Sequence, residues 1–438
     1  MVEKAVGSGM LLRNLIEMFQ ERVLVYDGSK GVLLQAKGLQ GHEACEAWNI
    51  TRPEDIRDIY TAYKQAGSDV LQTNTFPGNR VTLTGYGLED KVYELNAAGV
   101  RLAREVAGDT QYVSASIGPT GLMFAPAGDL TFQAAYDIFR EQVQAVADAD
   151  CIHFETFTDI MEMRAALLAA RENSSLPIIA SFTVNENGRT LSGNTPEACT
   201  IICQSLGASM VGVNCSFGPD KLVSIIERMY SVATVPLVVK ANAGLPEMIN
   251  GQVVFRETPE HFASFTEAFI LHGVRLIGGC CGTKPNFIRA IRKEVDKCAW
   301  PEWVKPSSSR IASPFQWNSI DHELLEKVGR VMVEKDGQEM IDKAQTLIQN
   351  GANIICLDFQ QLNSELDVQD FLGFFSLYVK TPMIIKASDP AILKTILRFY
   401  PGRAGCIVDD LSQEVIQDID DFGALPLYQY QLNSFIEK

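Results

Sequence analysis

The sequence of 438 residues has no continuous apolar run of about 18 residues, so we expect no membrane span. Positive charge is also scarce: 38 Lys and Arg against 54 Asp and Glu give a net charge of −16, which argues against a nucleic-acid surface. The N-terminus shows no small-residue cleavage site of a signal peptide, and ten cysteines are too few for a disulfide scaffold. We therefore expect a cytoplasmic protein with reduced thiols.

Short β-rich apolar runs recur along the first 300 residues, and amphipathic helical stretches separate them. Strand and helix alternating eight times is typical of a (β/α)8 TIM barrel. An open doubly wound sheet is the rival, but no Gly-x-Gly-x-x-Gly follows the first strand. The predicted strands are residues 23–29, 69–76, 112–119, 151–157, 177–184, 210–216, 236–243 and 275–281.

A change of composition divides the chain after this pattern. We predict a barrel over residues 1–297 and a linker over 298–322, where prolines and serines gather. About five further strand and helix units predict a smaller, partial barrel-like α/β domain over 323–438. A partial barrel exposes edges and apolar faces, so we expect it to pack on the first barrel, on a second copy of the chain or on a partner.

Polar side chains stand at the carboxyl ends of the predicted strands, where TIM barrels carry their active sites. Buried polar groups need partners, so their convergence on one face predicts a functional site. The residues are Asp27, Asn74, Glu155, Asn214, Cys215, Asn242, Cys280 and Cys281.

Three of these residues are cysteines on strands that lie close together in a barrel. Cys215 ends the sixth strand, and Cys280 and Cys281 end the eighth. Three thiolates without a fourth protein ligand predict a catalytic zinc site, with the fourth position open to an incoming thiol. The trio could instead be small buried hydrophobic residues, or Cys280 and Cys281 could pair as a disulfide. The other seven cysteines are interpreted as core or incidental.

Five segments occur in the order seen in homocysteine S-methyltransferases: VYDGSKGVLL, EACEAWNITRPEDIRDIYTAYKQAGSDVLQTNTF, HFETF, GVNCSFGP and IGGCCGTKP. Residues 10–297 resemble this family, and within it most closely the homocysteine-binding module of cobalamin-dependent methionine synthases. The resemblance implies that Cys215, Cys280 and Cys281 are catalytic and bind Zn²⁺.

The resemblance also implies which residues bind the substrate. The first-strand segment Asp27, Gly28 and Ser29, together with Glu155, would hold the amino-acid end of homocysteine. This agrees with chemistry, because an ammonium group is best bound by carboxylates and a carboxylate by backbone N–H groups near glycine. Asn214 is a further candidate for orienting loops or the ligand, whereas His153, in mid-strand, is predicted to be a core residue.

Lys30 departs from the family pattern in the first motif and places a charge beside the expected pocket. It leaves open whether the acceptor is homocysteine or another, anionic thiol.

The second domain resembles more weakly the first half of the pterin-binding barrel of methionine synthases, on QEMIDKAQTLIQNGANIICLDF and TPMIIKASDPAILKTILRFYPGRAGCIV. Its polar residues differ, with Asp358 and Lys386 at the ends of the second and third strands, so we expect poor binding of methyltetrahydrofolate.

No Asp-x-His-x-x-Gly sequence is present, so we expect the chain to lack the cobalamin-carrying module of the family. The resemblance thus implies methyl transfer to homocysteine from a separately encoded methylcorrinoid protein. The alternatives are a small donor such as a methylsulfonium or betaine, or a non-catalytic scaffold for a corrinoid or folate protein. Self-association also stays open.

Overall fold

The computed structural model describes residues 15–125, 127–245, 247–249, 252–301, 309–320, 327–334, 337–360, 367–409 and 411–428. Its first sheet has eight parallel strands, and consecutive strands are neighbours. A bridge between Tyr26 and Val70 joins the two end strands, so the sheet closes and the predicted barrel is confirmed. The strands are β1 (Leu24–Val25), β2 (Val70–Gln72), β3 (Tyr112–Ile117), β4 (Cys151–Phe157), β5 (Ile178–Phe182), β6 (Met210–Cys215), β7 (Leu237–Ala241) and β10 (Val274–Gly279).

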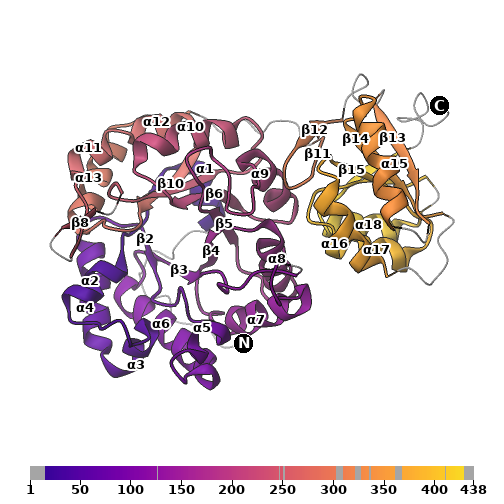
Figure 1. Ribbon diagram of the computed structural model, residues 1–438. Helices are drawn as coiled ribbons and strands as arrows, with labels where there is room; N and C mark the ends of the chain where they lie inside the picture. Colours follow the sequence, from indigo (N-terminus) through magenta and orange to yellow (C-terminus); the bar gives the residue numbers. More distant parts are fainter. Residues whose placement is uncertain are drawn as a thin grey trace, which may run out of the picture.

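Helices surround this barrel as a ring (Figure 1). Several begin where a hydroxyl or carboxylate accepts a hydrogen bond from the first turn, as Thr131, Asp159 and Thr195 do. The helices are α2 (Lys30–Ala36), α3 (Trp48–Thr51), α4 (Pro53–Gln65), α5 (Arg80–Thr84), α6 (Val92–Ala107), α7 (Phe132–Ala145), α8 (Ile160–Asn173), α9 (Pro196–Ser205), α10 (Pro219–Tyr230), α11 (Pro259–Ala263), α12 (Thr266–Leu271) and α13 (Pro285–Val295). Short 3-10 helices η1 (Cys45–Ala47) and η2 (Glu89–Lys91) and a hairpin of β8 (Glu247–Ile249) and β9 (Gln252–Val254) complete this part.

The amino-terminal end of the barrel is closed by apolar side chains. Helix α1 (Leu15–Glu21) places Leu15 and Phe19 against buried residues from all eight strands, and both side chains are themselves buried. The polar ends of the strands are therefore left at the opposite, carboxyl-terminal end. Within the described part of the chain, every helix is too short or too polar to cross a bilayer.

A second sheet of five parallel strands follows, and its strands pair in sequence order. They are β13 (Val328–Met332), β14 (Ile354–Asp358), β15 (Met383–Lys386), β16 (Gly405–Ile407) and β17 (Leu425–Leu427), with α15 (Gly337–Gln349), α16 (Val368–Tyr378), α17 (Pro390–Phe399) and α18 (Gln413–Asp421). The expected smaller α/β unit is thus confirmed. Within 298–322, β11 (Arg310–Ala312) and β12 (Trp317–Ser319) form an antiparallel hairpin. The exact domain limits stay a prediction.

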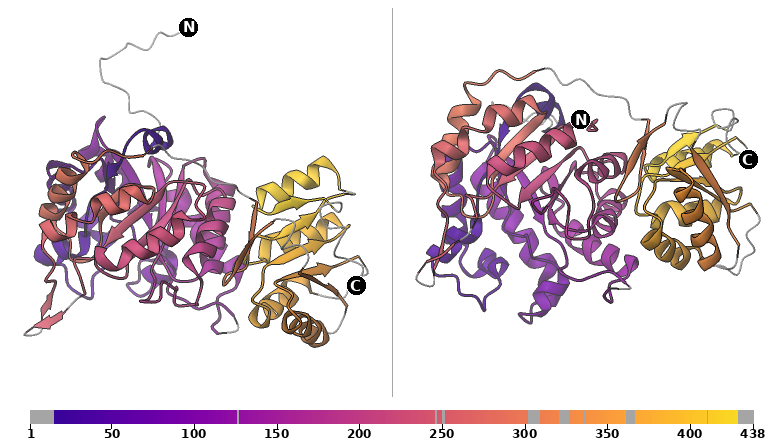
Figure 2. Two further views of the ribbon diagram at one scale, coloured as in Figure 1. Left: turned by 90° about the horizontal axis from the view of Figure 1, so that it is seen from above. Right: turned by 45° about the horizontal axis from the view of Figure 1, so that its top comes forward.

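The second unit packs beside the barrel, next to α8 and α9 (Figures 1 and 2). Arg164 of α8 is almost fully buried and donates hydrogen bonds to the main-chain oxygens of Leu397, Arg398 and Gly402. Burying a guanidinium is costly, and no carboxylate among the described residues pairs with this one; burial lowers the pKa of Arg164 to about 9. The three carbonyl oxygens of the second unit accept their hydrogen bonds from this one side chain of the barrel, so the contact joins the two units.

Arg164→Met should loosen the second unit from the barrel, because it leaves three carbonyl groups without their donor. Each unsatisfied buried group costs about 1–3 kcal/mol. We expect faster proteolytic cleavage between the two units and a lower midpoint in denaturant. Arg140→Met is the matched control, since Arg140 lies half exposed on α7 and contacts Asp137 and the ring of Tyr136, both on the same helix. Equal cleavage rates in the two variants would contradict this role.

Candidate functional site

The three predicted cysteines lie together at the carboxyl end of the barrel. Their sulfur atoms are all within 4.8 Å of one another, and the sulfurs of Cys215 and Cys281 are 3.6 Å apart. Four sulfurs around zinc at about 2.3 Å are separated by about 3.8 Å in a regular tetrahedron. The separations of the thiols therefore suit one zinc ion with an open fourth position.

The backbone turns sharply at both strand ends, which lets neighbouring residues serve one site. Cys215 and Ser216 adopt φ angles of 60° and 65°, a region that non-glycine residues rarely enter. On the other strand, the N–H of Cys280 binds the oxygen of Ala241, and the N–H of Cys281 binds Oδ1 of Asn242. Strained backbone of this kind persists where surrounding contacts hold it, and it gathers at functional sites.

Asn214 is a buried residue that contacts the cluster of three cysteines. It is fully buried, and its Oδ1 accepts hydrogen bonds from the N–H of Thr156 and the hydroxyl of Ser181. Its Nδ2 donates to Oγ1 of Thr156 and lies 3.8 Å from the sulfur of Cys280. Asn214 thus orients Cys280, and its predicted contact with substrate stays a prediction.

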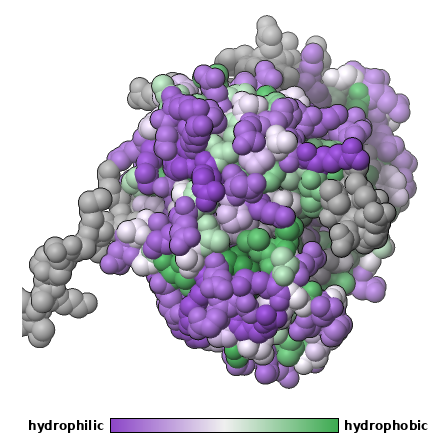
Figure 3. Space-filling view, turned by 90° about the vertical axis from the view of Figure 1, so that its left-hand side faces the viewer, coloured by the Kyte–Doolittle hydropathy of each residue, from purple (hydrophilic) through white to green (hydrophobic). Residues whose placement is uncertain are grey.

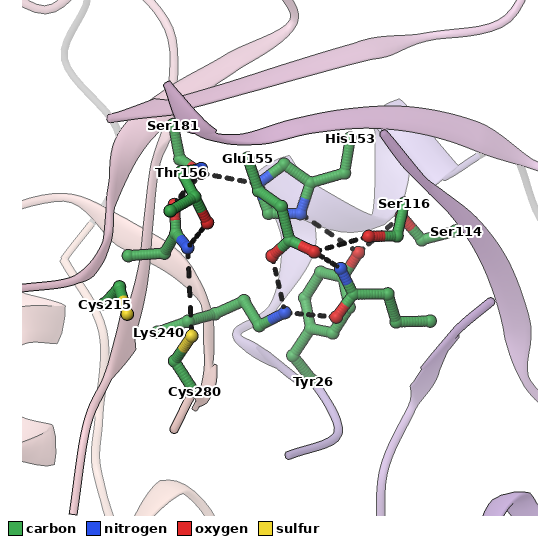
Figure 4. A network of polar contacts seen from close by, with 12 residues as sticks. Tyr26, Ser114, Ser116, His153, Glu155, Thr156, Ser181, Cys215, Lys240 and Cys280 are labelled. Atoms are coloured by element: carbon green, nitrogen blue, oxygen red, sulfur yellow. Dashed lines mark hydrogen bonds and ion pairs between the residues drawn. The ribbon is translucent and has the colours of Figure 1, made fainter. Parts of the chain in front are cut away.

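Glu155 forms the centre of a buried network (Figure 4). Its carboxylate accepts hydrogen bonds from Gln72, Ser116 and Lys240, and the Nζ of Lys240 lies 3.0 Å from Oε2. Burial has the largest single effect and opposes ionisation, but the positive charge of Lys240 and smaller contributions, among them the hydrogen bond from Ser116, together lower the pKa of Glu155 below its ordinary value. For Lys240, burial is again the largest effect and lowers the pKa, but Glu155, with the neighbouring Cys280 and Asp27, raises the pKa above its ordinary value. Both groups are therefore charged at neutral pH.

A second buried ion pair lies at the end of β1. The Nζ of Lys30 is 2.8 Å from Oδ2 of Asp27, which also accepts the N–H of Gln72. Oδ1 of Asp27 has no hydrogen-bond partner among the described residues, and burial raises the pKa of this carboxyl. Gly28 allows the chain to pass close to its neighbours, since a Cβ there would lie 2.8 Å from the hydroxyl of Thr283.

These groups surround one pocket of about 340 Å³. Gly28, Ser29, Glu155 and the three cysteines line it, whereas Asp27 and Asn214 are not among the lining residues. The assignment of these residues to a substrate stays a prediction. On the side of the barrel that carries α2, α11 and α13, the surface is mostly hydrophilic, with hydrophobic residues gathered in a hollow (Figure 3).

Sequence reasoning missed Lys240, Gln72, Ser116 and Thr156, all of which line the pocket. The available signal for Lys240 was a single charge inside the otherwise apolar run PLVVKANA. Cys45, interpreted as incidental, also lines the pocket.

His153 is a core residue, as predicted. It is fully buried, and its ring nitrogens lie within hydrogen-bonding distance of the hydroxyls of Tyr26 and Ser181. Burial lowers its pKa to about 4, so the imidazole is neutral. All ten cysteines are described and none forms a disulfide.

The second unit carries a separate ionic group at the carboxyl end of its sheet. Asp358 is fully buried, binds Arg330 through Oδ2 and has the Nζ of Lys386 4.0 Å away. A carboxylate already engaged by two cations is poorly placed to accept hydrogen bonds from a pterin ring. The weak binding of methyltetrahydrofolate stays a prediction that these contacts support.

A closed (β/α)8 barrel with three thiols gathered at its carboxyl end is the arrangement of a TIM-barrel enzyme with a candidate metal site. The sequence profile of the homocysteine S-methyltransferase family matches residues 24–295, and the chain belongs to this family. Methionine synthase of Mycobacterium tuberculosis is 29% identical in an alignment of 436 positions that covers 92% of this chain and 36% of that protein. Methionine synthase of Mycobacterium leprae is 28% identical with the same coverage. The chain therefore spans about a third of the length of these relatives.

Solved structures show the same fold. The homocysteine methyltransferase MmuM from Escherichia coli in its oxidised form has a TM-score of 0.54 and 22% identity, covering 62% of this chain and 95% of that chain. Its metallated form has a TM-score of 0.53 and 24% identity, covering 62% of this chain and 96% of that chain.

Proposed function

We propose that this protein transfers a methyl group to the thiol of homocysteine, giving methionine, with zinc held by Cys215, Cys280 and Cys281. The observation that carries the proposal is the convergence of three thiols, from two strands of the barrel, on a pocket that also contains Glu155. The membership of the chain in the homocysteine S-methyltransferase family supports the choice of acceptor.

The donor set suits zinc, since soft thiolates are preferred zinc ligands and the sulfur separations match a tetrahedral site. When bound, zinc would supply a Lewis acid that lowers the pKa of the acceptor thiol towards neutrality. Asn214 keeps Cys280 in position, and the left-handed backbone at Cys215 directs that thiol into the same site. Cys281 lines the pocket, and its backbone N–H is held by Asn242.

The amino-acid end of homocysteine would lie along Gly28, Ser29 and Glu155, which line the pocket, with Asp27 behind them. Lys240 keeps Glu155 ionised and so available to an ammonium group. In the transfer, a sulfur–carbon bond forms and the bond between the methyl carbon and the donor breaks. The electron pair of the broken bond stays on the donor, and the thiol proton leaves to solvent.

The methyl donor is proposed to be a methylcorrinoid protein encoded separately. The similarity of the chain to methionine synthases supports a donor of this kind. We also propose a cytoplasmic location, because ten unpaired cysteines, four of them around one pocket, suit a reducing compartment.

The test is methionine formation from homocysteine and free methylcobalamin by the zinc-loaded protein. Wild type should form methionine, and Cys215→Ala should lose at least about a hundredfold in rate, because a direct metal ligand matters more than an outer contact worth about 10–100-fold. Cys298→Ser is the control, since Cys298 lies outside the pocket, and it should keep wild-type activity. The proposal is overturned if zinc-loaded wild type methylates homocysteine with none of three donors: methylcobalamin, a methylsulfonium and betaine.

A further inference from the structure

Two lysines line the pocket, and they differ in how completely their charges are satisfied. The Nζ of Lys240 binds both Glu155 and Gln72 and lies 4.6 Å from the centre of the Tyr26 ring. An ammonium group has three N–H donors. Lys240 is therefore engaged on several sides, and its side chain is only 3% exposed.

Lys30 is engaged on one side only. Among the described residues, its Nζ makes a single hydrogen bond, to Oδ2 of Asp27, and its side chain is 11% exposed. The ring of Tyr60, 6.0 Å away, is a weak further contact. Two N–H donors of a positively charged group therefore remain at the pocket wall, where an anionic group of a ligand would satisfy them.

Asp27 explains how the positive charge of Lys30 is stabilised at the pocket wall without a bound ligand. Its carboxylate is fully buried beneath the pocket lining; Oδ2 holds Lys30, while Oδ1 has no hydrogen-bond partner in the described part of the chain. A buried carboxylate is stabilised by a cationic partner, so Asp27 keeps the ammonium group of Lys30 in place at the pocket. The Asp27–Lys30 pair has no net charge. A ligand with one carboxylate and one ammonium group also has none, so its binding leaves the net charge of the pocket unchanged.

We infer that Lys30 is a specificity-determining residue that binds the acid group of the acceptor thiol, while Asp27 holds Lys30 in place. This inference rests on the proposed function for the sulfur end of the acceptor. It divides the pocket into two parts. The three cysteines receive the sulfur, and Lys30 selects thiols that carry a carboxylate over thiols that do not.

The experiment measures binding to the zinc-loaded protein by calorimetry with three thiols. Homocysteine carries a carboxylate and an ammonium group, 4-mercaptobutyrate carries only the carboxylate, and 3-aminopropane-1-thiol carries only the ammonium group. Lys30→Met should weaken the first two by about 10- to 100-fold, the usual worth of a hydrogen bond to a charged group, and should leave the third within about threefold. Lys30→Arg should retain most of the affinity for both carboxylates.

Since Lys30→Met leaves Asp27 buried without its partner, the double variant Lys30→Met and Asp27→Asn removes both charges and guards against misfolding. The double variant should show the same loss of affinity for homocysteine and for 4-mercaptobutyrate. Equal binding of the carboxylated thiols by wild type and by both variants would overturn the inference, as would an equal loss for all three thiols. If binding depends on Lys30 but no methyl transfer to homocysteine occurs, the proposed function fails and this inference stands.

Discussion

Cys281→Ala purified with zinc should carry almost no metal, whereas wild type should carry one zinc per chain. Three thiols within 4.8 Å of one another provide all the protein ligands of the proposed site, so the loss of one leaves only two. Outer contacts of metal ligands are worth about 10–100-fold in affinity, and a direct ligand should exceed that range. Competition with a chromophoric chelator measures the affinity, and elemental analysis measures the content.

Cys298→Ser provides the matched control for metal binding, because Cys298 is also partly exposed but lies outside the thiol cluster. Its zinc content should equal that of wild type. Asn214→Ala should give an intermediate result, since Asn214 only orients Cys280. A Cys281→Ala protein that retains one tightly bound zinc would place the metal elsewhere and contradict the three-cysteine site.

Lys240→Met should destabilise the barrel by about 3–5 kcal/mol, the usual cost of removing one partner of a buried ion pair. The variant leaves the carboxylate of Glu155 buried, with Gln72 and Ser116 but without a compensating charge. Urea unfolding followed by a probe in the barrel measures the loss. Adding Glu155→Gln should restore most of the stability, because the second change removes the uncompensated charge.

The pH dependence of Lys240→Met follows from the same contacts. Without Lys240, burial raises the pKa of Glu155 above its value in the unfolded chain. Stability is then retained below the unfolded pKa and lost as the pH rises through the folded pKa. The deficit relative to wild type should therefore shrink as the pH falls towards 5. A loss below about 1 kcal/mol at pH 8, or no recovery in the double variant, would contradict the role of the pair.

The local pattern of the sequence was enough to predict the barrel and the place of its site. Eight apolar β-rich runs separated by amphipathic helices admit few topologies, and the carboxyl ends of parallel strands meet at one end of a barrel. Cys215 and Cys281, 66 residues apart, could therefore be placed together before any coordinates. The partial second unit followed from the same kind of pattern.

The sequence was thus enough to predict that the three cysteines and Glu155 reach the pocket end of the barrel, because strand periodicity and chain topology are local or nearly so. The pairing of the charges could be learned only from the folded chain. Lys240 meets Glu155 across 85 residues, and Arg164 meets the carbonyl of Arg398 across 234. Such pairs depend on the register between distant strands and on the packing of one unit against the other. These are properties of the closed barrel and its neighbour, which no spacing along the chain records.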